Sequence, residues 1–164
     1  MSRSTSTNAG ETTFAGERTI PSSAPGAIAG PYGDVLLLLG RILLGGIFVI
    51  SGYAKITGVA AFSASLERRG VPASSVLGMI GACVEFFGGL AIVLGIEVRY
   101  AAALMVAFVI VATLISHRFW EFQGEVRTAQ TTNFSKNVAI GGGFIILLAA
   151  GGGRLALERL WRRT

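Results

Sequence analysis

The sequence has little charge. Asp, Glu, Lys and Arg make up 14% of its 164 residues, whereas soluble domains carry about 25%. Hydrophobic residues make up 52%, and the mean hydropathy is +0.64. These values exclude an ordinary soluble domain and predict a membrane protein, with a length that fits one compact domain.

Cysteine and histidine are almost absent, with Cys83 and His117 the single examples of each. One cysteine excludes an internal disulfide and a CxxC redox pair. One histidine excludes a haem held by two histidines, and the two residues together are too few for a His/Cys zinc cluster. We therefore expect no metal site in this chain, so any redox metal would belong to a partner.

Both ends of the chain are polar, and the net charge of +5 is concentrated at the C-terminal end. Residues 154–164 carry four arginines against Glu158, directly after an apolar segment. This pattern is typical of an anchor on the cytoplasmic membrane surface, not of a nucleic-acid interface. Residues 1–33 are rich in Ser, Thr, Gly, Ala and Pro, which predicts a disordered tail without a cleaved signal peptide.

Four apolar segments lie between the two tails, at about residues 35–53, 75–96, 98–116 and 138–153. Each has roughly 16 to 22 residues, close to the ~20 that a helix needs to cross a bilayer. The fourth is the shortest. We therefore predict an all-α fold, a polytopic antiparallel bundle of four transmembrane helices over residues 34–153.

The connections between these segments differ in character. Residues 97–99 allow only a tight turn, so the second and third segments form an antiparallel hairpin. Residues 54–74 contain a short amphipathic stretch, which predicts a surface helix that Pro72 ends. Residues 117–137 are polar but hold several aromatic side chains, as is typical of a membrane interface.

Four spans place both termini on one side of the membrane. Lys and Arg number seven on that side and six on the other, so the charge count hardly decides the orientation. The dense C-terminal arginine cluster favours a cytoplasmic location for both termini.

Polar residues of the first segment share one helical face. Spacings of four, three, four and three residues connect Arg41, Gly45, Phe48, Gly52 and Lys55. Glycines on such a stripe allow a neighbouring helix to approach closely. The charged face is therefore predicted to be the packed face.

Glu85 lies near the middle of the second segment. Four glycines share its side of the helix: Gly78, Gly81, Gly88 and Gly89. With Gly45 and Gly52 of the first segment, they are the predicted helix-packing positions.

Arg41 and Glu85 are predicted to differ in depth by roughly 5 Å when the two segments are aligned at their midpoints. A salt bridge or a bridging water between them is expected. The alternatives are that Arg41 extends to the membrane surface and that Glu85 is a protonated structural group. Ionisable groups inside membranes are also often functional, so both remain candidate ligand-binding residues.

A second polar group gathers at the opposite ends of the helices. It comprises Lys55, His117, Asn133, Lys136 and Asn137. Together they form a candidate site for a polar head on an apolar body. The alternatives are a histidine that interacts with a helix dipole and lysines that bind lipid headgroups.

The chain resembles the DoxX family of small bacterial inner-membrane proteins. The resemblance covers about residues 36–152 and rests on GRILLGGIFVISGYAKI, VEFFGGLAIVLGI, SHRFW and NFSKNVAIGGGFIILL. It implies a four-helix bundle in the inner membrane. The positions that match polar positions of the family are Arg41, Lys55, Glu85, His117, Lys136 and Asn137.

The function that the resemblance implies is a subunit of a membrane redox system. Since the chain lacks ligands for a metal, such a subunit would bind a quinone or anchor a redox-enzyme partner. Two other classes stay open: a structural or regulatory membrane protein without small-molecule chemistry, and a small transporter or proton conduit along Arg41 and Glu85. The sequence leaves the oligomeric state open.

Overall fold

The computed structural model describes residues 31–161, so the predicted N-terminal tail lies almost entirely outside the described residues. Its last three residues already belong to the first helix, which begins at Pro31. The elements follow in the order α1 (Pro31–Thr57), α2 (Val59–Glu67), α3 (Ser74–Leu94), α4 (Val98–Ser116), the 3₁₀ turn η1 (Phe119–Glu121), α5 (Gly124–Ala150) and α6 (Glu158–Trp161).

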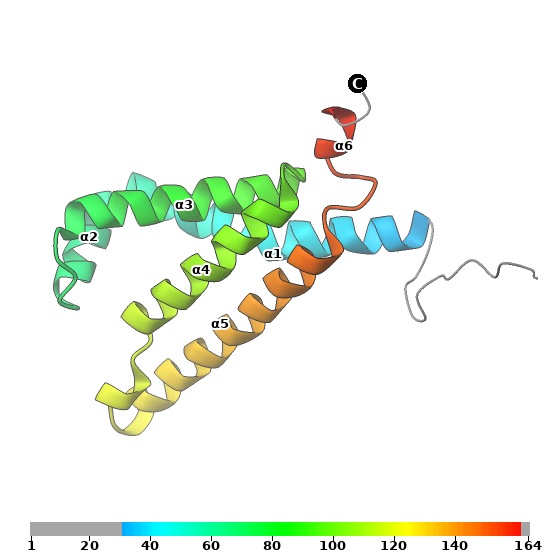
Figure 1. Ribbon diagram of the computed structural model, residues 1–164. Coiled ribbons are helices and arrows are strands. Elements are labelled where there is room, and N and C mark those ends of the chain that lie inside the picture. The colour runs from blue at the N-terminus through cyan, green and yellow to red at the C-terminus, as the bar shows by residue number, and fades with distance from the viewer. Residues whose placement is uncertain (1–30, 162–164) are drawn as a thin grey trace, which may run out of the picture.

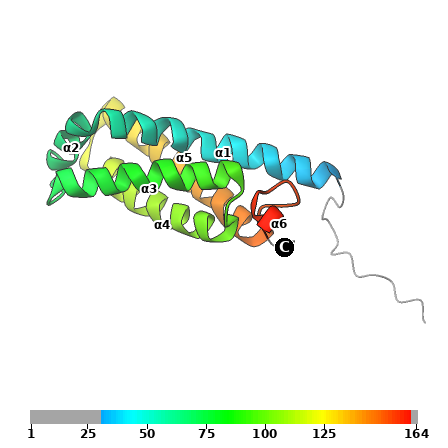
Figure 2. The ribbon, with the colours of Figure 1, turned by 90° about the horizontal axis from the view of Figure 1, so that it is seen from above.

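Four of these helices are long and apolar enough to span a membrane: α1, α3, α4 and α5. Helices α1 and α3 lie side by side, and α4 and α5 form a second pair that is inclined to the first (Figure 1). The view from above shows the same pairing, with α6 beside the α3–α4 turn (Figure 2). The predicted all-α, four-helix membrane bundle is confirmed.

The predicted hairpin between the second and third segments is the α3–α4 turn. Gly95 ends α3 with φ of 78°, and the N–H groups of Gly95 and Ile96 both donate to the carbonyl of Ala91. This pattern is the usual glycine-terminated helix end. Glu97 then precedes α4 with φ of 40°, so only three residues separate the two helices.

The predicted short surface helix is α2, which ends at Glu67, several residues before Pro72. A positive φ of 76° at Gly70 lies in the turn between them. The stop is therefore a glycine turn, and proline is not the terminating residue.

Helix α5 begins earlier than expected. Residues 117–137 were predicted to be a connection, but α5 starts at Gly124 and only residues 117–123 connect it to α4. Its first half has no apolar stripe, so hydrophobic periodicity does not reveal it. The hydroxyls of Thr128, Thr131 and Thr132 each donate to the carbonyl four residues earlier, so these side chains are satisfied within the helix.

Glycines bring α1 and α3 into backbone contact. A Cβ atom added at Gly45 would lie 2.7 Å from the carbonyl oxygen of Gly89, and one at Gly52 would lie 2.6 Å from the backbone nitrogen of Phe86. A Cβ at Gly89 would lie 2.8 Å from Phe48 Cβ. These distances leave no room for a side chain, so Gly45, Gly52 and Gly89 form the α1–α3 interface.

The other predicted packing glycines of α3 do not face α1. Gly78 lies against Ser63 and Leu66 of α2, and Gly88 lies against Met105 of α4. Gly81 does not take part in close packing, since an added Cβ would find its nearest neighbour, Phe108, 4.0 Å away. Gly78 and Gly88 are thus packing positions, as predicted, but they face helices other than α1 because three helices surround α3.

Candidate functional site

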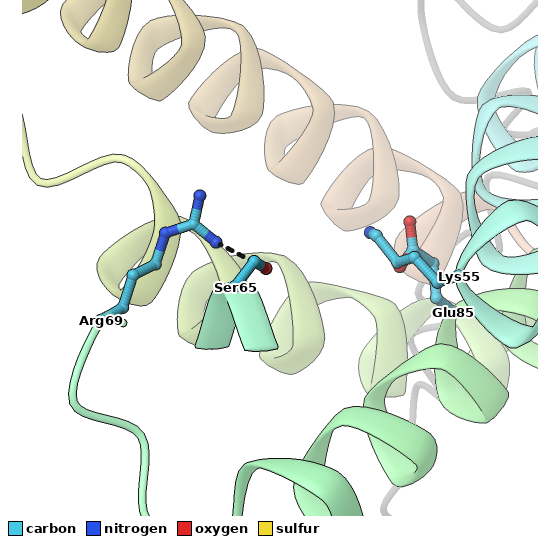
Figure 3. A network of polar contacts seen from close by, with 4 residues as sticks. All are labelled: Lys55, Ser65, Arg69 and Glu85. Carbon is cyan, nitrogen blue, oxygen red and sulfur yellow. Dashed lines mark hydrogen bonds and ion pairs between the residues drawn. The ribbon is translucent and has the colours of Figure 1, made fainter. Parts of the chain in front are cut away.

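Glu85 forms an ion pair with Lys55 of α1. The Lys55 Nζ atom lies 2.5 Å from Glu85 Oε2, and the Glu85 side chain is 4% exposed against 32% for Lys55. Figure 3 shows the two side chains next to each other. A separate hydrogen bond, between Arg69 and Ser65 of α2, lies some way from them. The Lys55 ammonium also lies 5.2 Å from the centre of the Phe62 ring, in a cation–π arrangement. The buried carboxylate therefore has a cation as its partner.

The expected pairing of Arg41 with Glu85 was wrong. Arg41 lies fourteen residues before Lys55 on α1, or about 21 Å along the helix axis. The error is one of register: Gly45 faces Gly89 and Gly52 faces Phe86, so α1 is displaced along α3 from a midpoint alignment. As a result, the first turns of α1 project past the α3–α4 turn (Figure 1).

Arg41 lies at the other end of the bundle, level with the α3–α4 turn, and has 0% exposure. A Cβ added at Gly95 would collide with its Nη1 atom, so glycine is required there for space as well as for backbone conformation. Its Nη2 atom donates to the carbonyl of Leu155 at 3.0 Å. The Nε and Nη1 atoms are buried and have no hydrogen-bond partner in the structure.

The segment after α5 folds back over Arg41. The N–H groups of Leu157 and Glu158 donate to the carbonyls of Leu94 and Gly95 at the end of α3. The Glu158 carboxylate accepts from the N–H of Val98, which begins α4, at 3.0 Å. It also supplies the negative charge that acts on Arg41. Residues 151–158 therefore pack against this end of the bundle, whereas the sequence predicted that residues 154–164 form a basic surface tail.

The second predicted group is only partly assembled. Lys55 turns to Glu85, Lys136 is exposed, and Asn133 is half-buried without a side-chain hydrogen bond among those found in residues 31–161. His117 and Asn137 do lie on facing sides of the α4–α5 pair. His117 Nδ1 is 2.9 Å from Gln130 Oε1, and Asn137 Nδ2 donates to Thr113 Oγ1 at 2.9 Å.

A groove of 370 Å³ runs along α4 and α5 beside this amide. Its polar lining consists of Thr113 and Asn137, and apolar side chains with Gly141 and Gly142 form the remainder. His117 lies one helical turn beyond Thr113 on α4. The groove is thus almost wholly apolar, with the Thr113–Asn137 hydrogen bond at one end of its lining.

Three residues of these polar contacts were missed by sequence reasoning: Thr113, Gln130 and Glu158. Thr113 and Gln130 have no charge to mark them, although Thr113 stands four residues before His117 on the same helical face. Glu158 was read only as part of a basic tail. Its contacts depend on a fold-back that no local pattern in the sequence predicts.

Comparison with known proteins supports the resemblance seen in the sequence. The family model described as DoxX matches residues 36–118. The chain is 32% identical to inner membrane protein YphA of Escherichia coli (strain K12) over 125 residues, covering 76% of this chain and 89% of that protein. It is 35% identical to inner membrane protein YqjF of the same organism over 127 residues, covering 77% and 92%.

No solved structure matches the chain. The family match includes most of α1 and all of α3 and α4, so Arg41, Lys55 and Glu85 lie within it. Helix α5 with Asn137 lies beyond its end. The four apolar helices and the two relatives named as inner membrane proteins agree with each other. The chain therefore belongs to the DoxX family and is a multi-pass inner-membrane protein.

Proposed function

We propose that this protein is a non-catalytic membrane subunit that holds a quinone in the α4–α5 groove for a redox-enzyme partner. The observation that carries the proposal is the groove itself, with apolar walls and the Thr113–Asn137 pair at one end. A quinone combines an apolar tail with carbonyl oxygens that need hydrogen-bond donors. The groove supplies the apolar walls, and the Asn137 amide at one end supplies the donor.

The Thr113–Asn137 end of the groove offers a hydrogen-bond donor. Asn137 uses one N–H for Thr113, whose own hydroxyl donates to the Val109 carbonyl at 2.6 Å. The second N–H of the amide can donate to a quinone carbonyl. His117 lies one helical turn beyond Thr113, outside the groove lining, where its Nδ1 pairs with Gln130 Oε1 at 2.9 Å.

Quinone binding in detergent tests the proposal directly. Gly141→Leu should weaken the binding of a short-chain ubiquinone by about tenfold, because leucine fills a groove in which an added Cβ meets nothing within 4 Å. Asn137→Leu should weaken it comparably by removing the amide donor. Isothermal titration with the purified protein measures both affinities.

Gly46→Leu is the matched control, since Gly46 is equally open but lies on α1, outside the groove. It should bind quinone as the unaltered protein does. Equal affinity in Gly141→Leu and Gly46→Leu would contradict the α4–α5 site.

We also propose that both termini face the cytoplasm, as the C-terminal arginines favour. A cytoplasm-active reporter fused after Thr164 should be active, and one fused near Arg68 in the α2–α3 connection should not. The reverse pattern of activity would place the His117 end of the bundle inside the cell.

A further inference from the structure

A second groove lies between α1 and α5, at the end of the bundle opposite the His117 group. It has a volume of 510 Å³ and is lined mostly by leucine and isoleucine, with Gly40 on α1, Gly143 on α5 and one charged residue, Arg41. The groove is open to the surroundings of the bundle, which in a membrane are lipid chains.

Arg41 is the only lining residue of this groove that can form an ion pair. Arg41 is one of the residues that line the groove, and Nε is the first nitrogen along its side chain. Nε is buried without a partner, as is Nη1, while Nη2 is bound by a single backbone carbonyl. An unsatisfied N–H on a charged group in an apolar setting is costly. An anionic oxygen from a ligand in the groove would remove that cost.

The depth of Arg41 identifies the kind of ligand. Arg41 is level with the α3–α4 turn, where α3 ends and α4 begins, and so lies near the surface end of these two spans. Three more arginines, Arg99, Arg154 and Arg159, are exposed at this end. Three acidic residues lie at this end as well. Asp34 interacts with Arg154, and Glu97 lies in the α3–α4 turn. Glu158 accepts from the N–H of Val98, and its charge also acts on Arg41. Basic pockets between helices at a membrane surface suit anionic lipid headgroups.

We infer that the α1–α5 groove binds an anionic glycerophospholipid, with an acyl chain along the groove and a phosphate oxygen on Arg41. Because Arg41 has 0% exposure, the side chains that separate Nε from the groove move aside when the phosphate binds, while the Leu155 carbonyl keeps Nη2. This site is separate from the proposed quinone site, which lies between α4 and α5. The lipid would stabilise the weakly packed junction of α1 with α5.

Native mass spectrometry with phosphatidylglycerol and phosphatidylcholine tests this site. The unaltered protein should retain phosphatidylglycerol in preference to phosphatidylcholine. Gly40→Leu should reduce phosphatidylglycerol binding by about tenfold, because its side chain enters the groove where an added Cβ meets nothing within 4 Å. Gly40 touches none of the α1–α3 interface glycines, so the variant should fold.

Gly46→Leu serves again as the control, since it is open on the same helix but outside this groove. It should retain the lipid preference, and quinone affinity should be unchanged in Gly40→Leu. Arg41→Gln should abolish the preference for phosphatidylglycerol where it folds. Equal lipid binding in Gly40→Leu and Gly46→Leu, or equal binding of the two lipids by the unaltered protein, would overturn the inference.

Discussion

Gly52→Leu should lower the free energy of unfolding by about 3 kcal/mol or more and broaden elution from a sizing column. An added Cβ at Gly52 would lie 2.6 Å and 2.7 Å from the backbone nitrogen and Cα of Phe86. Backbone atoms of a helix cannot move aside as the end of a flexible side chain can, so α1 and α3 would have to separate. Overpacking of this kind usually costs about 1–3 kcal/mol, and more where backbones meet. Thermal unfolding in detergent measures the loss.

Two glycines provide matched controls for this effect. Gly46 on α1 and Gly81 on α3 have no neighbour closer than 4.0 Å to an added Cβ. Gly46→Leu and Gly81→Leu should therefore have unfolding temperatures within a few degrees of the unaltered protein. The higher helix propensity of leucine should raise their stability slightly. If Gly52→Leu behaved like these controls, α1 and α3 would not be in backbone contact.

Lys55→Met should destabilise the protein by about 3 kcal/mol, because it leaves the Glu85 carboxylate buried without its cation. Glu85→Gln should cost less. The Lys55 side chain that it leaves behind is one-third exposed and can extend towards the membrane surface. Lys136→Met, at an exposed lysine of α5, should have almost no effect.

The double variant separates a true pair from two independent residues. Lys55→Met combined with Glu85→Gln should be more stable than the sum of the two single losses predicts, since no charge is left without a partner. Simple additivity in thermal unfolding would mean that Lys55 and Glu85 do not interact.

The four spans could be predicted because a run of about twenty apolar residues has the length and composition of a membrane-spanning helix and few other stable structures. The stripe of Arg41, Gly45, Phe48, Gly52 and Lys55 correctly indicated a packed face of α1. Its charged ends could not be matched to partners from the sequence. Partner choice depends on the register of α1 along α3, and the Gly45–Gly89 and Gly52–Phe86 contacts set that register.

The candidate site was harder to predict. Asn137 and His117 were recognised as polar residues beside apolar spans, but their partners Thr113 and Gln130 depend on how α4 faces α5. The early start of α5 was missed because its first half is polar on all sides. The contact of residues 151–158 with Arg41 brings together segments more than one hundred residues apart, which local patterns do not encode.

Mass spectrometry of lipid-soluble ligands, on protein purified in mild detergent from quinone-containing bacterial membranes, tests the central claim most directly. The unaltered protein and Gly46→Leu should each retain a quinone, and Gly141→Leu should have lost most of it. Purified protein that retains no quinone, or equal amounts of quinone in Gly141→Leu and Gly46→Leu, would contradict a quinone site between α4 and α5.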